Sequence, residues 1–142
     1  MATVELRFSA LPEHVRTARL VAAAVARRAG VDEAVLDEVR LAVGEACTRA
    51  VGLHQSAGIT SPVRVVLTEE EKQFSIEVGD EAPRVVAADG TPGAHGGAEE
   101  PEGEDEMGLA VISGLVDDVE VTAGEAGGSI RMTWPTTPSV AV

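Results

Sequence analysis

The sequence predicts an α+β fold, a two-layer α/β sandwich in which helices pack on one face of a mixed, mostly antiparallel sheet. Alternating apolar and polar residues predict a single strand near the start of the chain and two hairpins further on. Segments whose apolar residues repeat at helical spacing lie between them. The 142 residues suffice for one core and are too few for two generous ones. We therefore expect a single domain over residues 1–135 and a loose tail over 136–142.

One strand and two helices are predicted in the first part of the chain. Alternating apolar and polar residues predict a strand over 4–8. Pro12 fits the first turn of an Ala-rich helix, which Gly30 ends. Asp32 can cap a second helix, whose apolar residues repeat at helical spacing as far as Ala50. The two helices therefore follow each other directly.

Two hairpins and a third helix are predicted in the second part. The hairpins cover 61–80 and 117–134, and a short helix covers 106–116. Residues 80–105, rich in Gly, Pro and acidic side chains, offer little to bury and predict a mobile loop. Pro135 ends the last strand. The side chains expected to point inward from the hairpins are Val63, Val65, Leu67, Phe74, Ile76, Val78, Val119, Val121, Ile130, Met132 and Trp134.

Composition excludes or disfavours several classes of function. The 11 Lys and Arg stand against 24 Asp and Glu, and a formal net charge of −13 disfavours binding to nucleic acid or to an anionic membrane. The three aromatic residues lie in strand-like stretches, so we expect them in the core and not on a base-stacking surface. Cys47 is the only cysteine, which excludes an intramolecular disulfide. With no signal-like or membrane-spanning apolar run, we expect a cytoplasmic protein.

Glu45 and Arg49 lie one turn apart on the second predicted helix, on the face opposite its apolar residues. A carboxylate in that position can act as a general base or as a metal ligand. The simpler interpretation is a solvated ion pair with Arg49, worth about 0.2–0.5 kcal/mol. The spacing alone leaves both interpretations open.

Asp80 comes at the end of an apolar strand and directly before a turn. A carboxylate there can hold a ligand donor such as the amino group of a base, or can simply start the turn. The predicted helix start at 106–108 offers free amides to an anion. Six acidic residues crowd its approach and oppose a phosphate: Glu99, Glu100, Glu102, Glu104, Asp105 and Glu106.

Arg16, Arg19 and Arg27 form a basic stripe along the first predicted helix, at spacings of three and eight. The stripe is either a docking edge for an acidic partner or a solvated face. The three histidines are scattered without the spacing of a metal site, and we expect each at the surface. They are His14, His54 and His95.

Five stretches in order and spacing resemble the anti-sigma factors with serine-kinase activity of the SpoIIAB and RsbW type. They are FSALPEHVRTARLVAAAVA, LDEVRLAVGEACTRAV, IEVGDEA, EMGLAVISGLVDDVEV and GGSIRMTW. That family belongs to the GHKL superfamily of gyrase-, Hsp90- and histidine-kinase-like ATPases. The resemblance covers nearly the whole chain up to the tail. It implies a Bergerat-type nucleotide site, with residues 81–105 as a degenerate ATP lid.

The resemblance also implies roles for single residues. Glu45 matches the general base for phosphoryl transfer, and Asp80 matches the carboxylate that reads adenine. Gly108 retains one glycine of the lid motif. Such proteins hold a sigma factor off RNA polymerase until a STAS-type anti-anti-sigma protein competes for the same surface. Arg19 matches a helix-1 arginine that contacts both partners, which favours the docking interpretation of Arg16 and Arg19.

The departures from the family pattern gather in the nucleotide site. Arg49 replaces the Asn that coordinates Mg²⁺, and a guanidinium cannot ligate a metal. Ala82 replaces the glycine of Asp-x-Gly, and Glu106 replaces a lid glycine. Gly128 stands in place of the threonine near adenine, unless Ser129 shifts to supply its hydroxyl.

We therefore predict an anti-sigma-factor-like regulator that binds a sigma factor or a STAS-type partner, with nucleotide binding weakened or lost and no cofactor or metal required. The first alternative is an active serine kinase that uses Mg-ATP and phosphorylates the STAS protein. A further alternative is a structural partner that lends its sheet to a true kinase. Dimers are common in the family, so a homodimer is possible with any of these.

Overall fold

The computed structural model describes residues 2–83 and 102–136, and in the second range it describes side chains from residue 109 onward. Along the chain the elements are β1 (Ala2–Phe8), η1 (Pro12–His14), α1 (Val15–Ala29), η2 (Glu33–Val35), α2 (Leu36–Ala57), β2 (Val63–Glu69), β3 (Gln73–Asp80), α3 (Glu102–Leu115), β4 (Asp118–Gly124) and β5 (Gly127–Pro135). The predicted order of strand, two helices, hairpin, helix and hairpin is confirmed.

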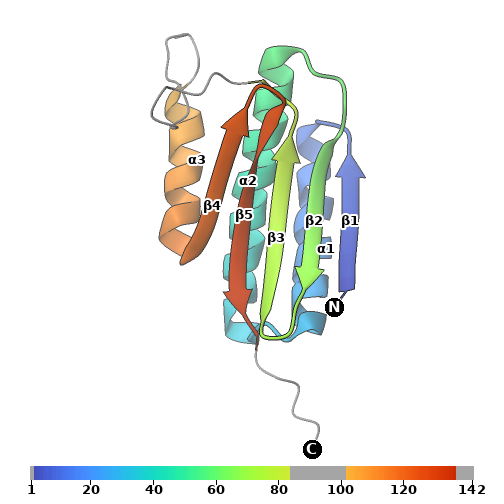
Figure 1. Cartoon of the computed structure of the whole chain (residues 1–142), viewed down its shortest axis with the longest axis vertical. Coiled ribbons are helices and arrows are strands. Elements are labelled where there is room, and N and C mark those ends of the chain that lie inside the picture. Colours follow the sequence, from blue (N-terminus) through green and yellow to red (C-terminus); the bar gives the residue numbers. More distant parts are fainter. Residues whose placement is uncertain (1, 84–101, 137–142) are drawn as a thin grey trace, which may run out of the picture.

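The strands form one sheet in the order β1-β2-β3-β5-β4. Figure 1 shows α1 and α2 behind this sheet and α3 beside its β4 edge. The α+β class and the two layers are confirmed, and every pairing between described strands is antiparallel, without the parallel pairing that a mixed sheet would contain. Because β5 pairs with β3, the end of β3 lies beside the start of β5.

Left-handed glycines end both long helices. Gly30 (φ 102°) follows α1, and Gly58 (φ 68°) follows α2. Glycine adopts this conformation without the steric cost that a Cβ brings. Asp32 caps as predicted, since its carboxylate accepts the N–H of Ala34 at 2.9 Å. These caps give the sharp connection that lays α2 back along α1.

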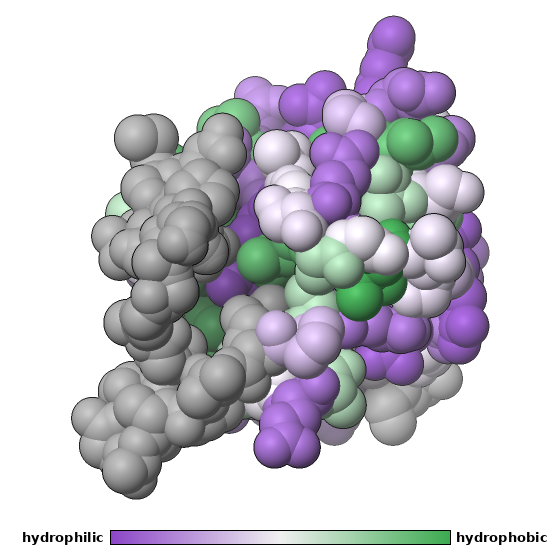
Figure 2. Space-filling model, turned by 90° about the horizontal axis from the view of Figure 1, so that it is seen from above, coloured by the Kyte–Doolittle hydropathy of each residue, from purple (hydrophilic) through white to green (hydrophobic). Residues whose placement is uncertain are grey.

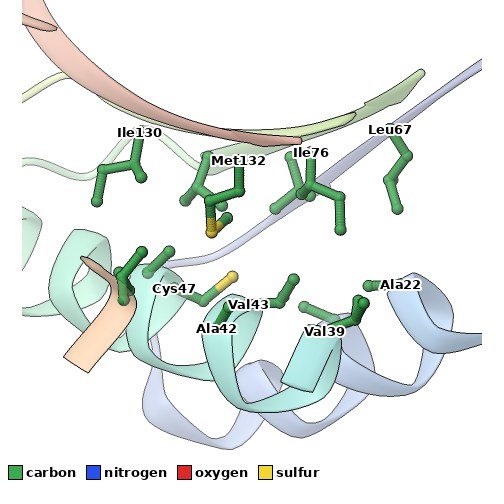
Figure 3. Packing of buried hydrophobic residues seen from close by; sticks show 14 of the residues in the cluster. Ala22, Val39, Ala42, Val43, Cys47, Leu67, Ile76, Ile130 and Met132 are labelled. Atoms are coloured by element: carbon green, nitrogen blue, oxygen red, sulfur yellow. The ribbon is translucent and has the colours of Figure 1, made fainter. Parts of the chain in front are cut away.

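The core lies between the sheet and the two long helices. Figure 3 shows Leu67, Ile76, Ile130 and Met132 descending from the sheet onto Ala22, Val39, Ala42, Val43 and Cys47 of the helices. Alanines on the buried helix faces keep the helix backbones close to each other and to the strands. The inward positions predicted for the first hairpin are all buried, as are Ile130, Met132 and Trp134 of the second.

Val121 was predicted to point inward and is 40% exposed. The reason is its place on β4, an edge strand that pairs only with β5. Val119, on the same strand, is half-buried and packs against the core. The alternating pattern of β4 was therefore read correctly as a strand, while the position of that strand in the sheet decides how much of it is covered.

The third helix begins earlier than predicted. We expected a loop as far as Asp105, and α3 starts at Glu102. Most of the proposed lid and the tail lie outside the described residues, as does His95. Within residues 2–83 and 102–136, no helix combines the length and apolar character needed to cross a membrane.

Candidate functional site

Asp80 is the last residue of β3, and the register places it opposite Gly128, the second residue of β5. Its side chain continues the alternation of Ile76 and Val78, so it lies on the helix-facing side of the sheet. It is only 7% exposed. Strand pairing has thus joined two residues that the sequence assigned to one site from distant motifs.

The turn after β3 is tightly constrained. The carboxylate of Asp80 accepts the N–H of Ala82 at 3.0 Å, and Ala82 is buried. Gly127 (φ 120°) backs onto this turn, because a Cβ placed on it would lie 2.1 Å from the carbonyl oxygen of Asp80. No side chain fits at position 127. The close approach comes from Gly127, while the position of the family glycine, 82, carries a methyl group.

Ser129 does not join Asp80. Strand alternation puts Ser129 on the open face of the sheet, one residue out of phase with Gly128. Its hydroxyl lies 2.9 Å from the hydroxyl of Thr122 on β4. The expectation that Ser129 could supply the missing threonine hydroxyl is therefore wrong. The position that faces the same side as Asp80 is Gly128, which has no hydroxyl.

Glu45 and Arg49 lie in the middle of α2, and both are half-buried outside the core. The nine residues from Glu45 to His54 correspond to roughly 13 Å along the helix axis. Because His54 contacts the turn after β3, Glu45 lies well away from Asp80 along the axis of α2. The site thus extends along α2 instead of gathering around one point.

The ion pair between Glu45 and Arg49, one of the two interpretations that the spacing left open, is not among the ion pairs of the described residues. The ion pairs between described side chains join Arg7 to Glu5, Arg27 to Glu33, Arg40 to Asp37 and Arg131 to Glu70. None joins Glu45 to Arg49. A helical i,i+4 pair is worth so little that other contacts easily override it.

The amides expected to hold an anion at 106–108 lie inside α3. A helix leaves free only the N–H groups of its first four residues, which here are residues 102–105. The N–H groups of Glu106 and Gly108 come later and fall within the helical hydrogen-bond pattern. The early start of α3 therefore removes the argument for a phosphate at that point.

His54 was expected at the surface and is fully buried. Its Nδ1 lies 3.0 Å from the carbonyl oxygen of Ser61, and its Nε2 accepts the N–H of Glu81 at 2.9 Å. Periodicity along α2 places it near the helix end but cannot reveal that two distant backbone segments cover it. His14 is half-buried, with its ring 6.2 Å from that of Phe8.

A groove of about 480 Å³ lies between α1 and α2, and it brings the basic residues of both helices together. It is lined by Arg16, Arg19, Leu20, Asp37, Arg40 and Leu41. The two leucines are unusually exposed, at 57% for Leu20 and 52% for Leu41. Arg27 belongs to the predicted stripe but does not line the groove, and it pairs with Glu33 at 3.3 Å.

Gly44 supports this groove from below. A Cβ placed on Gly44 would lie 2.8 Å from Cδ of Arg19, so the stem of Arg19 runs directly across the α2 backbone. The side chain of Arg19 as a whole remains exposed. Sequence reasoning selected Arg19 but missed Gly44, Leu20, Arg40 and Leu41, whose relation to it depends on how the helices cross.

Figure 2 looks onto the end of the molecule where β3 ends and β5 begins. In the described part of this face, hydrophobic residues occupy the middle and hydrophilic residues the periphery. Among the described residues, no group of three or more His, Cys, Asp and Glu side chains could hold a metal ion.

The family model for the histidine kinase-like ATPase domain matches residues 8–134 of the chain. The chain belongs to the histidine kinase-like ATPase domain family. The match spans every element from the last residue of β1 to β5, so this histidine kinase-like ATPase domain includes both the Asp80 turn and the α1–α2 groove.

Two known proteins resemble this histidine kinase-like ATPase domain over most of its length. The serine-protein kinase RsbW of Bacillus licheniformis is 29% identical over 136 residues, which cover 92% of this chain and 83% of the relative. The solved structure of the RsbU and RsbW domains of Rv1364c from Mycobacterium tuberculosis matches with a TM-score of 0.69 at 16% identity. That match covers 97% of this chain and 33% of the solved chain, and it supports the fold.

Proposed function

We propose that the protein is an anti-sigma-factor-like regulator that captures a partner in the α1–α2 groove and no longer depends on nucleotide. The observation that carries the proposal is the groove itself, where two exposed leucines lie among three arginines. The chain has a net charge of −13, yet this surface is basic and apolar. It therefore suits an acidic partner. The proposed partners are a sigma factor and a STAS-type anti-anti-sigma protein.

The arrangement of arginines favours an acidic partner segment with an apolar face. Arg40 is already engaged with Asp37, whereas Arg16 and Arg19 extend from α1 as exposed side chains. Arginines bind carboxylates in paired hydrogen bonds, and the leucines beside them offer apolar contact. A partner helix with acidic and apolar residues on one face would meet both.

Weakened nucleotide binding is supported by the chemistry of the positions that match the family site. Arg49 offers only donors where a metal needs an oxygen ligand. Gly128 has no side chain to place beside Asp80, and Ala82 is a buried methyl where the family has glycine. These residues do not fit a metal-bound triphosphate, so we derive no step of phosphoryl transfer through them.

An active serine kinase that uses Mg-ATP is the alternative. Two observations favour it: the similarity to a serine-protein kinase, and the retention of Glu45 on α2 and Asp80 at the end of β3. In this case Glu45 would be the base that accepts the proton of the substrate serine. For both functions we propose a cytoplasmic protein. A homodimer is compatible with both.

Partner capture tests the proposal. The purified chain is titrated by calorimetry with sigma factors and STAS-fold proteins of the same genome, without nucleotide. We expect Arg19→Ala to raise the dissociation constant at least about tenfold, because arginines at the centre of an interface often contribute much of the binding energy. Arg28→Ala is the matched control, since Arg28 is an exposed arginine of α1 that does not line the groove.

Glu45→Ala separates the two functions. It should leave capture unchanged if the protein acts by binding alone, and it should abolish phosphorylation of the STAS protein if the protein is a kinase. Capture that is equally strong in Arg19→Ala and the unaltered chain would refute the proposal.

A further inference from the structure

His54 is a fully buried titratable residue that the proposed function does not use. It lies in the last turn of α2, where Gly58 ends the helix in a left-handed conformation. The chain then turns back, and the carbonyl oxygen of Ser61 comes within 3.0 Å of Nδ1. On the other side of the ring, the N–H of Glu81 donates to Nε2 at 2.9 Å. One imidazole thus joins three segments that are distant in sequence.

These two contacts fix the protonation of the ring. A nitrogen that accepts an N–H cannot itself carry a proton, so Nε2 is unprotonated. The ring proton therefore sits on Nδ1 and is donated to the carbonyl oxygen of Ser61. His54 is neutral in this arrangement. Protonation would place a second donor opposite the N–H of Glu81 and break the contact.

A further hydrogen bond strengthens the same connection. The hydroxyl of Ser61 donates to the carboxylate of Glu81 at 2.8 Å. The turn is therefore held from the α2 side by His54 and Ser61, and from the β5 side by the close approach of Gly127 to Asp80. The position of Asp80 depends on contacts made within the chain.

Among the described residues, the charged groups near this cluster lie on the turn, on β2 and between β4 and β5. On the turn itself they are the carboxylates of Asp80 and Glu81. The connection 58–62 carries no charged side chain, and Arg64 of β2 extends over Gly79 on the open face of the sheet. Glu125, in the turn between β4 and β5, is exposed.

We propose that His54 is a positioning residue for the Asp80 turn: its neutral imidazole ties the turn to α2 through the N–H of Glu81. The inference does not rest on the proposed function, which places partner capture in the α1–α2 groove. The connection itself involves no nucleotide, metal or partner.

Hydrogen exchange of the Glu81 amide in the full chain and in two His54 variants, measured by NMR at about pH 7.5, tests this directly. The rates are corrected for the intrinsic exchange of each sequence. We expect the protection of this amide to fall roughly three- to tenfold in His54→Leu, the effect of losing one hydrogen bond. The amide of Val78, in the centre of the sheet, serves as the internal reference.

Two variants distinguish positioning from packing. His54→Gln keeps an oxygen acceptor near the place of Nε2, so its Glu81 amide should stay protected. His54→Leu fills the space without an acceptor, so that amide should exchange faster while the Val78 amide is unchanged. Circular dichroism checks that each variant folds, and if His54→Leu does not, His54→Met takes its place.

Equal protection of Glu81 in the unaltered chain and in a folded variant without the acceptor would overturn the inference. The same loss of protection in His54→Gln as in His54→Leu would also overturn it, because the glutamine retains an acceptor. Exchange at Glu81 requires no partner, so a failure to capture sigma or STAS proteins would count against the proposed function alone.

Discussion

At the scale of single residues, Gly44 links the packing of two helices to the proposed function. Gly44→Ala should weaken partner capture, because the new methyl group displaces the stem of Arg19 from α2. Gly52→Ala, on the same helix with open space around it, is the matched control. It should raise the free energy of unfolding by about 0.5–1 kcal/mol and leave capture unchanged.

Denaturant unfolding and calorimetry measure both effects. Gly44→Ala should stabilise less than Gly52→Ala, since relief of glycine's backbone entropy is offset by the displaced Arg19. In an Arg19→Ala background the two alanine variants should stabilise equally. A Gly44→Ala protein that captures its partner with unchanged affinity would show that the path of Arg19 over α2 is irrelevant to binding.

Gly127 is the residue whose backbone conformation the Asp80 turn requires. Gly127→Ala should lower the free energy of unfolding by at least about 2 kcal/mol, because a φ of 120° is unfavourable for alanine and its Cβ would overlap the carbonyl oxygen of Asp80. Gly124→Ala, in the same hairpin with nothing nearby, should change it by less than about 0.5 kcal/mol. Urea unfolding compares the two, and equal effects would contradict this account of the turn.

The sequence predicted some of these residues and missed others for a physical reason. Asp80 and Gly128 were assigned to one site because they stand at positions of two separate family motifs, and strand pairing brings them together. The burial of His54 and the path of Arg19 over Gly44 depend on contacts between segments distant in sequence. The Glu45–Arg49 pair is a different case, since helical spacing permits this contact but does not require it.

At the scale of elements, α2 carries two of the candidate site residues, Glu45 and Arg49, and contributes Cys47 to the core. Burial raises the pKa of the Cys47 thiol to about 12. In the unfolded chain the thiol ionises near its ordinary value of about 8.5, whereas the native thiol stays protonated. The free energy of unfolding should therefore fall as the pH rises between these two values.

The contribution of Cys47 is isolated by comparison with Cys47→Val, which keeps an apolar side chain of similar size. Urea unfolding at about pH 7 and about pH 10 should show a larger loss of stability for the unaltered chain than for the variant. An identical pH dependence in both proteins would mean that the thiol is not the source of the loss.

Element boundaries followed from the sequence where a side chain or glycine marks them. Gly30 and Asp32 set the junction of the first two long helices as predicted. The start of α3 had no such marker, because the acidic and glycine-rich residues before it resemble a loop. The local sequence pattern also does not show where a strand lies in the sheet. Val121 is exposed because β4 is an edge strand.

At the scale of the whole molecule, charge is distributed unevenly. The chain is strongly acidic, yet Arg16, Arg19 and Arg40 gather along one groove between α1 and α2. Such a contrast directs an acidic partner to the groove and repels it from the remaining surface, with an effect that salt reduces. This groove is the surface on which the proposed partner capture depends.

The most direct test of the central claim is calorimetric titration of the purified chain with Mg-ATP, beside the Arg49→Asn variant. We predict no saturable binding by the unaltered chain at millimolar nucleotide, because Arg49 offers no oxygen ligand to the metal. Arg49→Asn restores an oxygen ligand and should bind measurably. Saturable binding of Mg-ATP by the unaltered chain below millimolar concentration would contradict the account and favour the kinase.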